Sequence, residues 1–119
     1  MTVLSRFHPS ALAARDRFHA ATIAEVASTV ARDKVVVVGM GWNPHVKNAR
    51  RILQAEDIGY TYLEYGTYVS AWKKRLAIKI WAGWPTFPMV FVNGALVGGA
   101  SDLEAVRKAG ELKAMIAAS

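Results

Sequence analysis

Two short segments of the chain carry residue types that suit ligand chemistry. Trp84-Pro85-Thr86-Phe87-Pro88 stands a few residues before Val92-Asn93-Gly94 and Gly98-Gly99. Further upstream, Asn43-Pro44-His45-Val46 has the pattern of a helix start, since Asn is a favoured N-cap and Pro fits the first helical position. Amides at a helix start favour an anion and would lower the pKa of a thiol placed there. No thiol is present, because the chain contains no cysteine.

The composition restricts both the chemistry and the partners. With no cysteine in 119 residues, disulfides, thiolate metal sites and cysteine nucleophiles are excluded. His8, His19 and His45 are far apart, and no cluster of His, Asp or Glu has ligand spacing, so we expect no metal site. The net charge of +6 favours anionic partners, so an acidic protein is one candidate partner, and we expect no nucleic acid.

Length and hydropathy are typical of a soluble, single-domain protein. A chain of 119 residues, 53% of them apolar, is long enough to bury one core. Residues 1–14 include Arg6, His8 and Pro9 where a signal peptide would be continuously apolar, and no run of about 18 apolar residues occurs. We therefore expect a cytoplasmic protein with no membrane partner.

The pattern of apolar and turn-forming residues predicts an alternation of helices and strands. Val35 to Val38 are β-branched and apolar on both faces, which is typical of a strand covered on both sides. The expected elements are a helix over 11–31 capped by Ser10, a strand over 35–38, a helix from Asn43, a strand over 60–65, a helix over 69–80, strands over 89–92 and 95–97 joined by an Asn93-Gly94 turn, and a helix over 102–116 interrupted at Gly110. We divide the chain into an N-terminal extension, residues 1–33, and a domain, residues 34–119.

The helix expected over 69–80 has two chemically different sides. Apolar residues at helical spacing form the side that we expect to face the core, namely Val69, Trp72, Leu76 and Ile80. The other side is basic and is expected to face solvent or an acidic partner through Lys73, Lys74, Arg75 and Lys79.

The order of these elements, together with the two motifs, resembles a known family. A strand-helix-strand unit followed by a helix and a hairpin is the order that a thioredoxin-like fold requires, with the first two strands parallel. The Trp-Pro-Thr-x-Pro segment at 84–88, the Phe-Val-Asn-Gly segment at 91–94 and Gly98-Gly99 resemble the C-terminal half of a glutaredoxin. The resemblance covers about residues 34 to 108 and is to the monothiol glutaredoxins. It implies an α/β fold with a four-stranded mixed sheet flanked by helices, here after an N-terminal helical extension.

The same resemblance locates what this chain lacks. Asn43 and Val46 stand where members of the family carry their cysteines, so neither monothiol nor dithiol chemistry is expected, and no iron–sulfur cluster. Met40 stands where the family has a lysine that meets a carboxylate of glutathione. We therefore expect no catalytic residue and no required cofactor, with glutathione as a candidate ligand.

Part of a glutathione groove is nevertheless implied. Arg75 and Lys79 match basic positions that serve a carboxylate of the ligand, and Phe87-Pro88 matches a dipeptide with a cis bond whose exposed backbone pairs with a peptide. Amides at the helix start after the paired glycines can receive an anion, beside Ser101 and Asp102. The implied ligand-binding residues are Asn43, Arg75, Lys79, Thr86, Phe87, Pro88, Gly99, Ser101 and Asp102.

Three functions remain open on these residues. The first is a non-catalytic module that binds glutathione, a γ-glutamyl compound or a peptide segment. The second is an interaction protein with a vestigial groove, whose basic helix surfaces meet an acidic partner. The third is a glutathione-dependent transferase, in which the helix start at Asn43 would stabilise a thiolate on bound glutathione. Each residue also has a purely structural interpretation, since Asn43-Pro44 is a good helix start and the fold itself requires Pro88.

Overall fold

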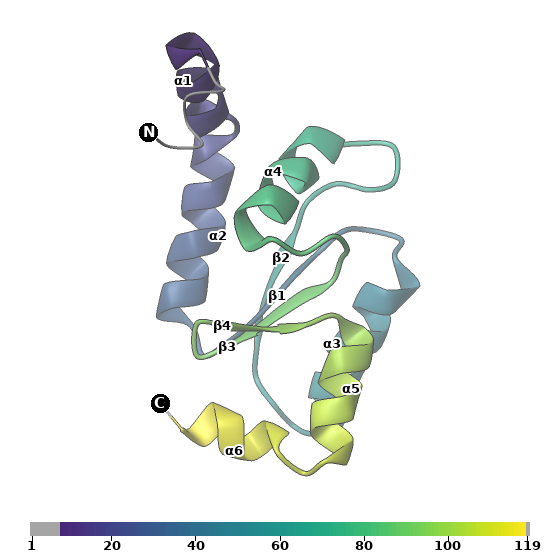
Figure 1. Ribbon diagram of the computed structural model, residues 1–119. Coiled ribbons are helices and arrows are strands. Elements are labelled where there is room, and N and C mark those ends of the chain that lie inside the picture. The colour runs from purple at the N-terminus through teal and green to yellow at the C-terminus, as the bar shows by residue number, and fades with distance from the viewer. Residues whose placement is uncertain (1–7, 119) are drawn as a thin grey trace.

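A four-stranded mixed sheet lies at the centre of the molecule (Figure 1). The computed structural model describes residues 8–118, apart from the side chains of residues 15 and 16. The strands are β1 (Val35–Gly39), β2 (Thr61–Glu64), β3 (Met89–Val92) and β4 (Ala95–Gly98), in the order β2-β1-β3-β4. β1 and β2 are parallel, whereas β3 is antiparallel to both β1 and β4. This topology confirms the thioredoxin-like fold expected from the sequence.

Helices cover both faces of the sheet. They are α1 (Pro9–Arg17), α2 (Ala20–Arg32), α3 (Pro44–Ala55), α4 (Trp72–Ala82), α5 (Ala100–Lys108) and α6 (Leu112–Ala117). On one face, Val26 of α2 and Ile78 of α4 share a core with the sheet; on the other, Leu53 of α3 and Leu103 of α5 do so. None of the helices in the described part of the chain is long and apolar enough to span a membrane.

The valine run forms the middle of both cores. Val36 and Val38 point into the core under α2 and α4, and Val35 and Val37 point into the core under α3 and α5. All four side chains are buried. The run therefore behaves as expected, because successive side chains of a strand point to opposite faces of a sheet.

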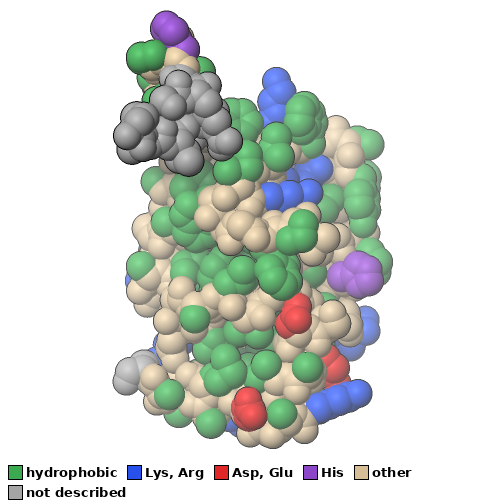
Figure 2. Space-filling model, in the orientation of Figure 1, with side chains coloured by type: hydrophobic (Ala, Val, Ile, Leu, Met, Phe, Trp, Pro, Cys, Tyr) green, Lys and Arg blue, Asp and Glu red, His purple; other side chains and the backbone are tan. Residues whose placement is uncertain are grey.

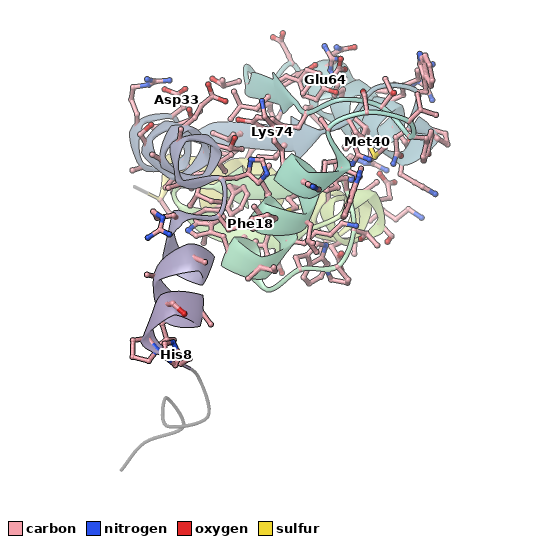
Figure 3. All side chains as sticks on the ribbon, turned by 90° about the horizontal axis from the view of Figure 1, so that it is seen from above. His8, Phe18, Asp33, Met40, Glu64 and Lys74 are labelled. Carbon is pink, nitrogen blue, oxygen red and sulfur yellow. The ribbon has the colours of Figure 1, made fainter. Side chains whose placement is uncertain are left out.

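The N-terminal helix differs from the expectation. A single helix over 11–31 is wrong, because α1 ends at Arg17 and α2 begins at Ala20. His19, between them, has φ 49, a left-handed conformation that interrupts an α-helix. α2 packs on the sheet through Val26 and Val30. By contrast, α1 continues away from the body of the molecule, as Figures 1 and 3 show.

The orientation of α4 also differs from the expectation. The apolar side chains predicted to face the core are exposed, Trp72 to 59% and Ile80 to 65%, and Val69 before the helix is exposed as well. The buried residues of α4 are Arg75, Ala77 and Ile78 instead. Helical spacing identified the apolar side of α4 correctly, but this side faces solvent.

The hairpin and the C-terminal helices follow the sequence pattern. Asn93 and Gly94 have φ 50 and φ 82, the positive values that a tight two-residue turn between β3 and β4 requires. The Asn93 side chain also donates hydrogen bonds to the carbonyls of Met115 and Ile116, at 2.7 and 3.2 Å, which ties α6 to the hairpin. Gly110, at φ 74, separates α5 from α6 where an interruption was expected.

Candidate functional site

A pocket of about 750 Å³ opens where the start of α3, the segment that precedes β3 and the start of α5 meet, and Lys79 of α4 also lines it. It brings together every predicted ligand-binding residue except Arg75, namely Asn43, Lys79, Thr86, Phe87, Pro88, Gly99, Ser101 and Asp102. The parallel β1–α3–β2 crossover and the hairpin place these segments, far apart in the sequence, at one edge of the sheet.

Asn43 is the N-cap of α3 and lines the wall of the pocket. Its side-chain oxygen accepts hydrogen bonds from the backbone amides of His45, at 2.9 Å, and Val46, at 3.2 Å. These first-turn amides have no partner within the helix, so the side chain satisfies them. An amide oxygen does this without a formal charge and without becoming a nucleophile. The side-chain nitrogen of Asn43 makes no hydrogen bond within the described residues and remains a donor at the pocket.

The two other positions that depart from the family pattern are apolar and buried. Val46 is 2% exposed and Met40 is 6% exposed, and both belong to the core under α2 and α4. Met40, which Figure 3 labels, follows the last residue of β1 in the segment that leads to α3. Neither side chain supplies a charge or a polar group to the pocket.

Lys79 and Phe87 form a paired wall of the pocket. The ammonium nitrogen of Lys79 lies 5.7 Å from the centroid of the Phe87 ring, within range of a cation–π contact. Phe87 is buried and is joined to Pro88 by a cis peptide bond, whereas Thr86 before it is exposed. Lys79 is half-buried, so its charge is both oriented by the ring and open to the pocket.

The start of α5 forms another wall. Its N-cap is Gly99, which has no side chain with which to cap the first-turn amides. Asp102 turns back to accept a hydrogen bond from the Gly99 amide at 2.9 Å, and Ser101 is exposed. Glu104 accepts hydrogen bonds from Arg107, and these bonds lower the pKa of Glu104 below its usual range. The positive end of the α5 dipole favours an anion at this wall, whereas the carboxylates of Asp102 and Glu104, which also line the pocket, oppose one.

Arg75 lies outside the pocket. Its guanidinium is buried, with the residue 7% exposed, and Nη1 donates hydrogen bonds to the carbonyl oxygens of Tyr65, at 3.1 Å, and Ser70. No acidic side chain among the described residues pairs with it. The expectation that Arg75 belongs to the solvent-facing basic side of its helix is wrong, because the guanidinium fixes the segment that leads from β2 to α4.

Some pocket residues were not predicted from the sequence. His45 and Asn48 line the pocket from α3, and Trp84 and Glu104 line it from the other two segments. His45 and Asn48 are three residues apart, so helical spacing places them on the same side of α3 as its capped start, a signal that was available. The indole nitrogen of Trp84 is buried without a hydrogen-bond partner in the described part of the chain.

The described residues provide no metal centre. No group of three or more His, Asp and Glu side chains within residues 8–118 lies close enough together to hold a metal ion. Because the chain has no cysteine, it also has no thiolate for an iron–sulfur cluster. The polar groups that line the pocket include side-chain amides, hydroxyls, an imidazole, an ammonium group and carboxylates, which suit an organic ligand with several charges.

Comparison with known proteins agrees with the fold. The chain is 45% identical over 87 residues to a glutaredoxin-like protein of Dictyostelium discoideum, which covers 73% of this chain and 71% of that protein. It is 36% identical over 64 residues to the mitochondrial monothiol glutaredoxin-5 of Schizosaccharomyces pombe, over 54% of this chain and 44% of that one. The crystal structure of a wheat glutaredoxin matches with a TM-score of 0.71 at 27% identity, over 81% of this chain and 91% of that one. No protein-family model matches the chain.

The fold is that of the thioredoxin-like proteins, with a helix placed before β1. Within that class, the chain belongs to the glutaredoxin family and is related to its monothiol members. Since it contains no cysteine, its own residues cannot catalyse thiol–disulfide exchange. What the chain shares with the family is therefore the fold.

Proposed function

We propose that this protein is a non-catalytic binding module for glutathione or a closely similar γ-glutamyl peptide. The observation that carries the proposal is the combination, in one concave site, of Lys79, the free donor of Asn43 and the start of α5. A pocket of about 750 Å³ lies within the range that small-molecule sites of proteins occupy.

The charges of the pocket fit the charges of such a ligand. Glutathione carries two carboxylates and one ammonium group. Lys79 suits one carboxylate, and the first-turn amides of α5 suit the other, because both provide donors with positive charge or partial positive charge. Asp102, exposed beside those amides, suits the ammonium group. The backbone of Phe87, which lines the pocket, suits the peptide groups of an extended ligand.

The geometry around Asn43 favours binding over catalysis. A transferase that activates the thiol of glutathione places a hydroxyl or a thiol at this helix start, whereas here an amide oxygen already accepts two backbone hydrogen bonds. The nearest first-turn amides of α3 are therefore used by the protein itself. A bound thiol gains no activating partner from Asn43, so conjugation of glutathione to an electrophile is not part of the proposal.

Titration with reduced glutathione, followed by backbone amide chemical shifts, tests this function. We expect shifts at Asn43, Lys79, Phe87 and Ser101 by millimolar ligand. Because the pocket has no thiol partner, S-methyl glutathione is expected to bind about as well. If neither ligand shifts these amides at millimolar concentration, the binding function is wrong and the groove is vestigial.

A matched pair of lysine variants separates specific binding from general attraction of an anion. Lys79→Ala removes the charge that faces the pocket, whereas Lys74→Ala removes an exposed charge from the same helix that does not line it. We expect Lys79→Ala to weaken binding about tenfold, equivalent to about 1.4 kcal/mol, with Lys74→Ala near the wild type. Equal losses in both variants would contradict a specific carboxylate contact at Lys79.

A further inference from the structure

The solvent-facing side of α4 carries an uninterrupted apolar stripe. Trp72, Leu76 and Ile80 stand four residues apart, so their side chains follow one another along the helix over about 12 Å. They are exposed to 59%, 40% and 65%. Figure 2 shows green apolar side chains in the upper part of the molecule, over α4, with blue basic side chains among them. A contiguous exposed surface of this kind marks an interaction site more often than a free surface.

A recess of about 550 Å³ adjoins the stripe, between α2 and α4. Ala20 and Ala24 of α2 and Ala77 of α4 are too short to fill the space, and Phe18, Ile80 and Trp81 border it with bulky side chains. Figure 3 labels Phe18 on the side of the N-terminal helices that faces α4. Ile80 belongs to both the recess and the stripe, so the two form one surface. We call it the α2–α4 groove, lined by Phe18, Ala20, Ala24, Ala77, Ile80 and Trp81.

The charged residues that α4 places beside the groove are all positively charged. Every charged residue of α4 is basic, and Lys73 and Lys74 are exposed. The ammonium nitrogen of Lys73 lies 5.7 Å from the ring of Trp72, directly beside the stripe. On α2, the carboxylate of Glu25 accepts a hydrogen bond from the hydroxyl of Tyr65, the residue after β2, and forms no ion pair with these lysines among the described residues. The groove is therefore apolar with a basic border.

We propose that the α2–α4 groove binds an amphipathic helix of a partner protein, with an apolar side that enters the groove and acidic residues on its flanks. A concave space between two helices accepts the bulky side chain of a third helix, as in helix-in-groove recognition. The length of the stripe matches about two turns of a partner helix. Acidic flanks follow from the basic border, since opposite charges across an interface favour the correct partner.

Two other occupants fit these observations less well. In a symmetric pair of copies, each stripe meets the same surface of its partner, so the lysines of the two α4 helices are brought toward one another. A membrane surface suits the lysines and Trp72, but a bilayer contacts protruding side chains and leaves the recess between α2 and α4 unfilled. A partner helix accounts for the stripe, the recess and the charges together.

Titration of the full chain with two synthetic helical peptides tests the proposal. Both peptides carry leucine at every third or fourth position; one has glutamate at the flanking positions and the other has lysine there. Backbone amide shifts report where each peptide binds. We expect the acidic peptide to shift amides of α2 and α4 and to bind at least about tenfold more tightly than the basic peptide, with a difference that shrinks as salt is added.

Three variants make the test specific to the groove. Ile80→Glu adds a negative charge at an exposed position of the stripe, and Ala24→Phe fills the recess without a change of charge. Ala114→Glu, at an exposed position of α6, is the matched control for the added charge. We expect the first two variants to bind the acidic peptide about tenfold more weakly than the wild type, and the control to bind it with unchanged affinity. None of the three residues lines the glutathione pocket, so the glutathione titration should stay as in the wild type.

The proposal is overturned if the two peptides bind alike, if Ile80→Glu and Ala24→Phe bind the acidic peptide as the wild type does, or if the shifts lie outside α2 and α4. Two further measurements address the other occupants. Sedimentation that shows a dimer abolished by Ile80→Glu, without binding of the acidic peptide, would assign the groove to a second copy. Co-sedimentation with phosphatidylserine vesicles, again without peptide binding, would assign it to a membrane surface.

Discussion

The backbone amide of His45 donates a hydrogen bond of 2.9 Å to the side-chain oxygen of Asn43, the residue that stands where glutaredoxins carry a cysteine. A thiolate at this place is stabilised by the same amide and by the positive end of α3. Asn43 accepts this hydrogen bond but, unlike a thiolate, carries no charge. In this chain the position serves helix capping, and two measurements test how it differs from a cysteine at the same place.

The first measurement concerns stability. Asn43→Ala leaves the first-turn amides of α3 without their acceptor, so we expect the free energy of unfolding to fall by about 1 kcal/mol. Asn43→Asp retains the acceptor and adds a charge that the helix dipole favours, so it should stay close to the wild type. Urea unfolding followed by circular dichroism gives both values. Equal losses in the two variants would show that burial of the side chain, not capping, matters here.

The second measurement restores a thiol. We expect the thiol of Asn43→Cys to have a pKa below the value of about 8.5 of an unperturbed thiol. The thiolate would accept hydrogen bonds from the backbone amides that now donate to Asn43. The rate of alkylation by iodoacetamide as a function of pH reports this pKa. Ala95→Cys, at an exposed position of β4, provides an unperturbed reference. Identical pH profiles would mean that the start of α3 no longer activates a thiol.

Arg75 is expected to be a structural residue. Arg75→Met removes the donors to the carbonyls of Tyr65 and Ser70, and we expect a loss of about 1–3 kcal/mol in the free energy of unfolding. Amide hydrogen exchange should also increase in residues 65–71. Lys74→Met, a neighbouring exposed position, is the control and should change neither quantity. A variant that keeps its stability but loses glutathione binding would instead place Arg75 in the ligand site.

Acid should weaken the fold in part through Asp33. Hydrogen bonds from Arg32 and Thr61 lower the pKa of Asp33 in the folded protein, so this carboxylate stabilises the fold above the unfolded pKa of about 4. That contribution is lost as the pH falls from about 4 through the lower, folded pKa. Urea midpoints measured between neutral pH and about pH 2.5 should therefore fall less steeply in Asp33→Asn. A parallel decline in both proteins would contradict a role for Asp33.

The strands and the hairpin were predictable because local chemistry decides them. Four consecutive valines have few alternatives to a strand covered on both sides, and Asn93-Gly94 accommodates the positive φ values that the turn requires. The pocket was predictable to the extent that the family resemblance fixed its segments. His45 directly follows the helix start in the sequence but was interpreted as a surface residue, and Asn48 lies three residues further along the same helix.

The orientation of α4 was not predictable from the helix alone. Trp72 and Ile80 have helical spacing, and apolar spacing usually indicates the buried side of a helix. In α4 the opposite holds. Two carbonyl groups outside the helix accept hydrogen bonds from the guanidinium of Arg75, so Arg75 is on the buried side and the apolar side faces solvent. The break at His19 was not predicted either, because the residue types at positions 18 and 19 do not differ from those found within a continuous helix.

The choice of arginine at position 75 has a consequence for how the molecule responds to its surroundings. An arginine presents several N–H donors in a fixed planar arrangement, whereas a lysine presents one flexible ammonium group. Nη1 of Arg75 donates to carbonyl oxygens at both ends of the segment from Tyr65 to Ser70, so a single side chain holds this segment. No thiol or disulfide contributes to this anchoring, because the chain contains no cysteine. The position of α4, and of the apolar stripe on it, therefore does not depend on the oxidation state of a thiol.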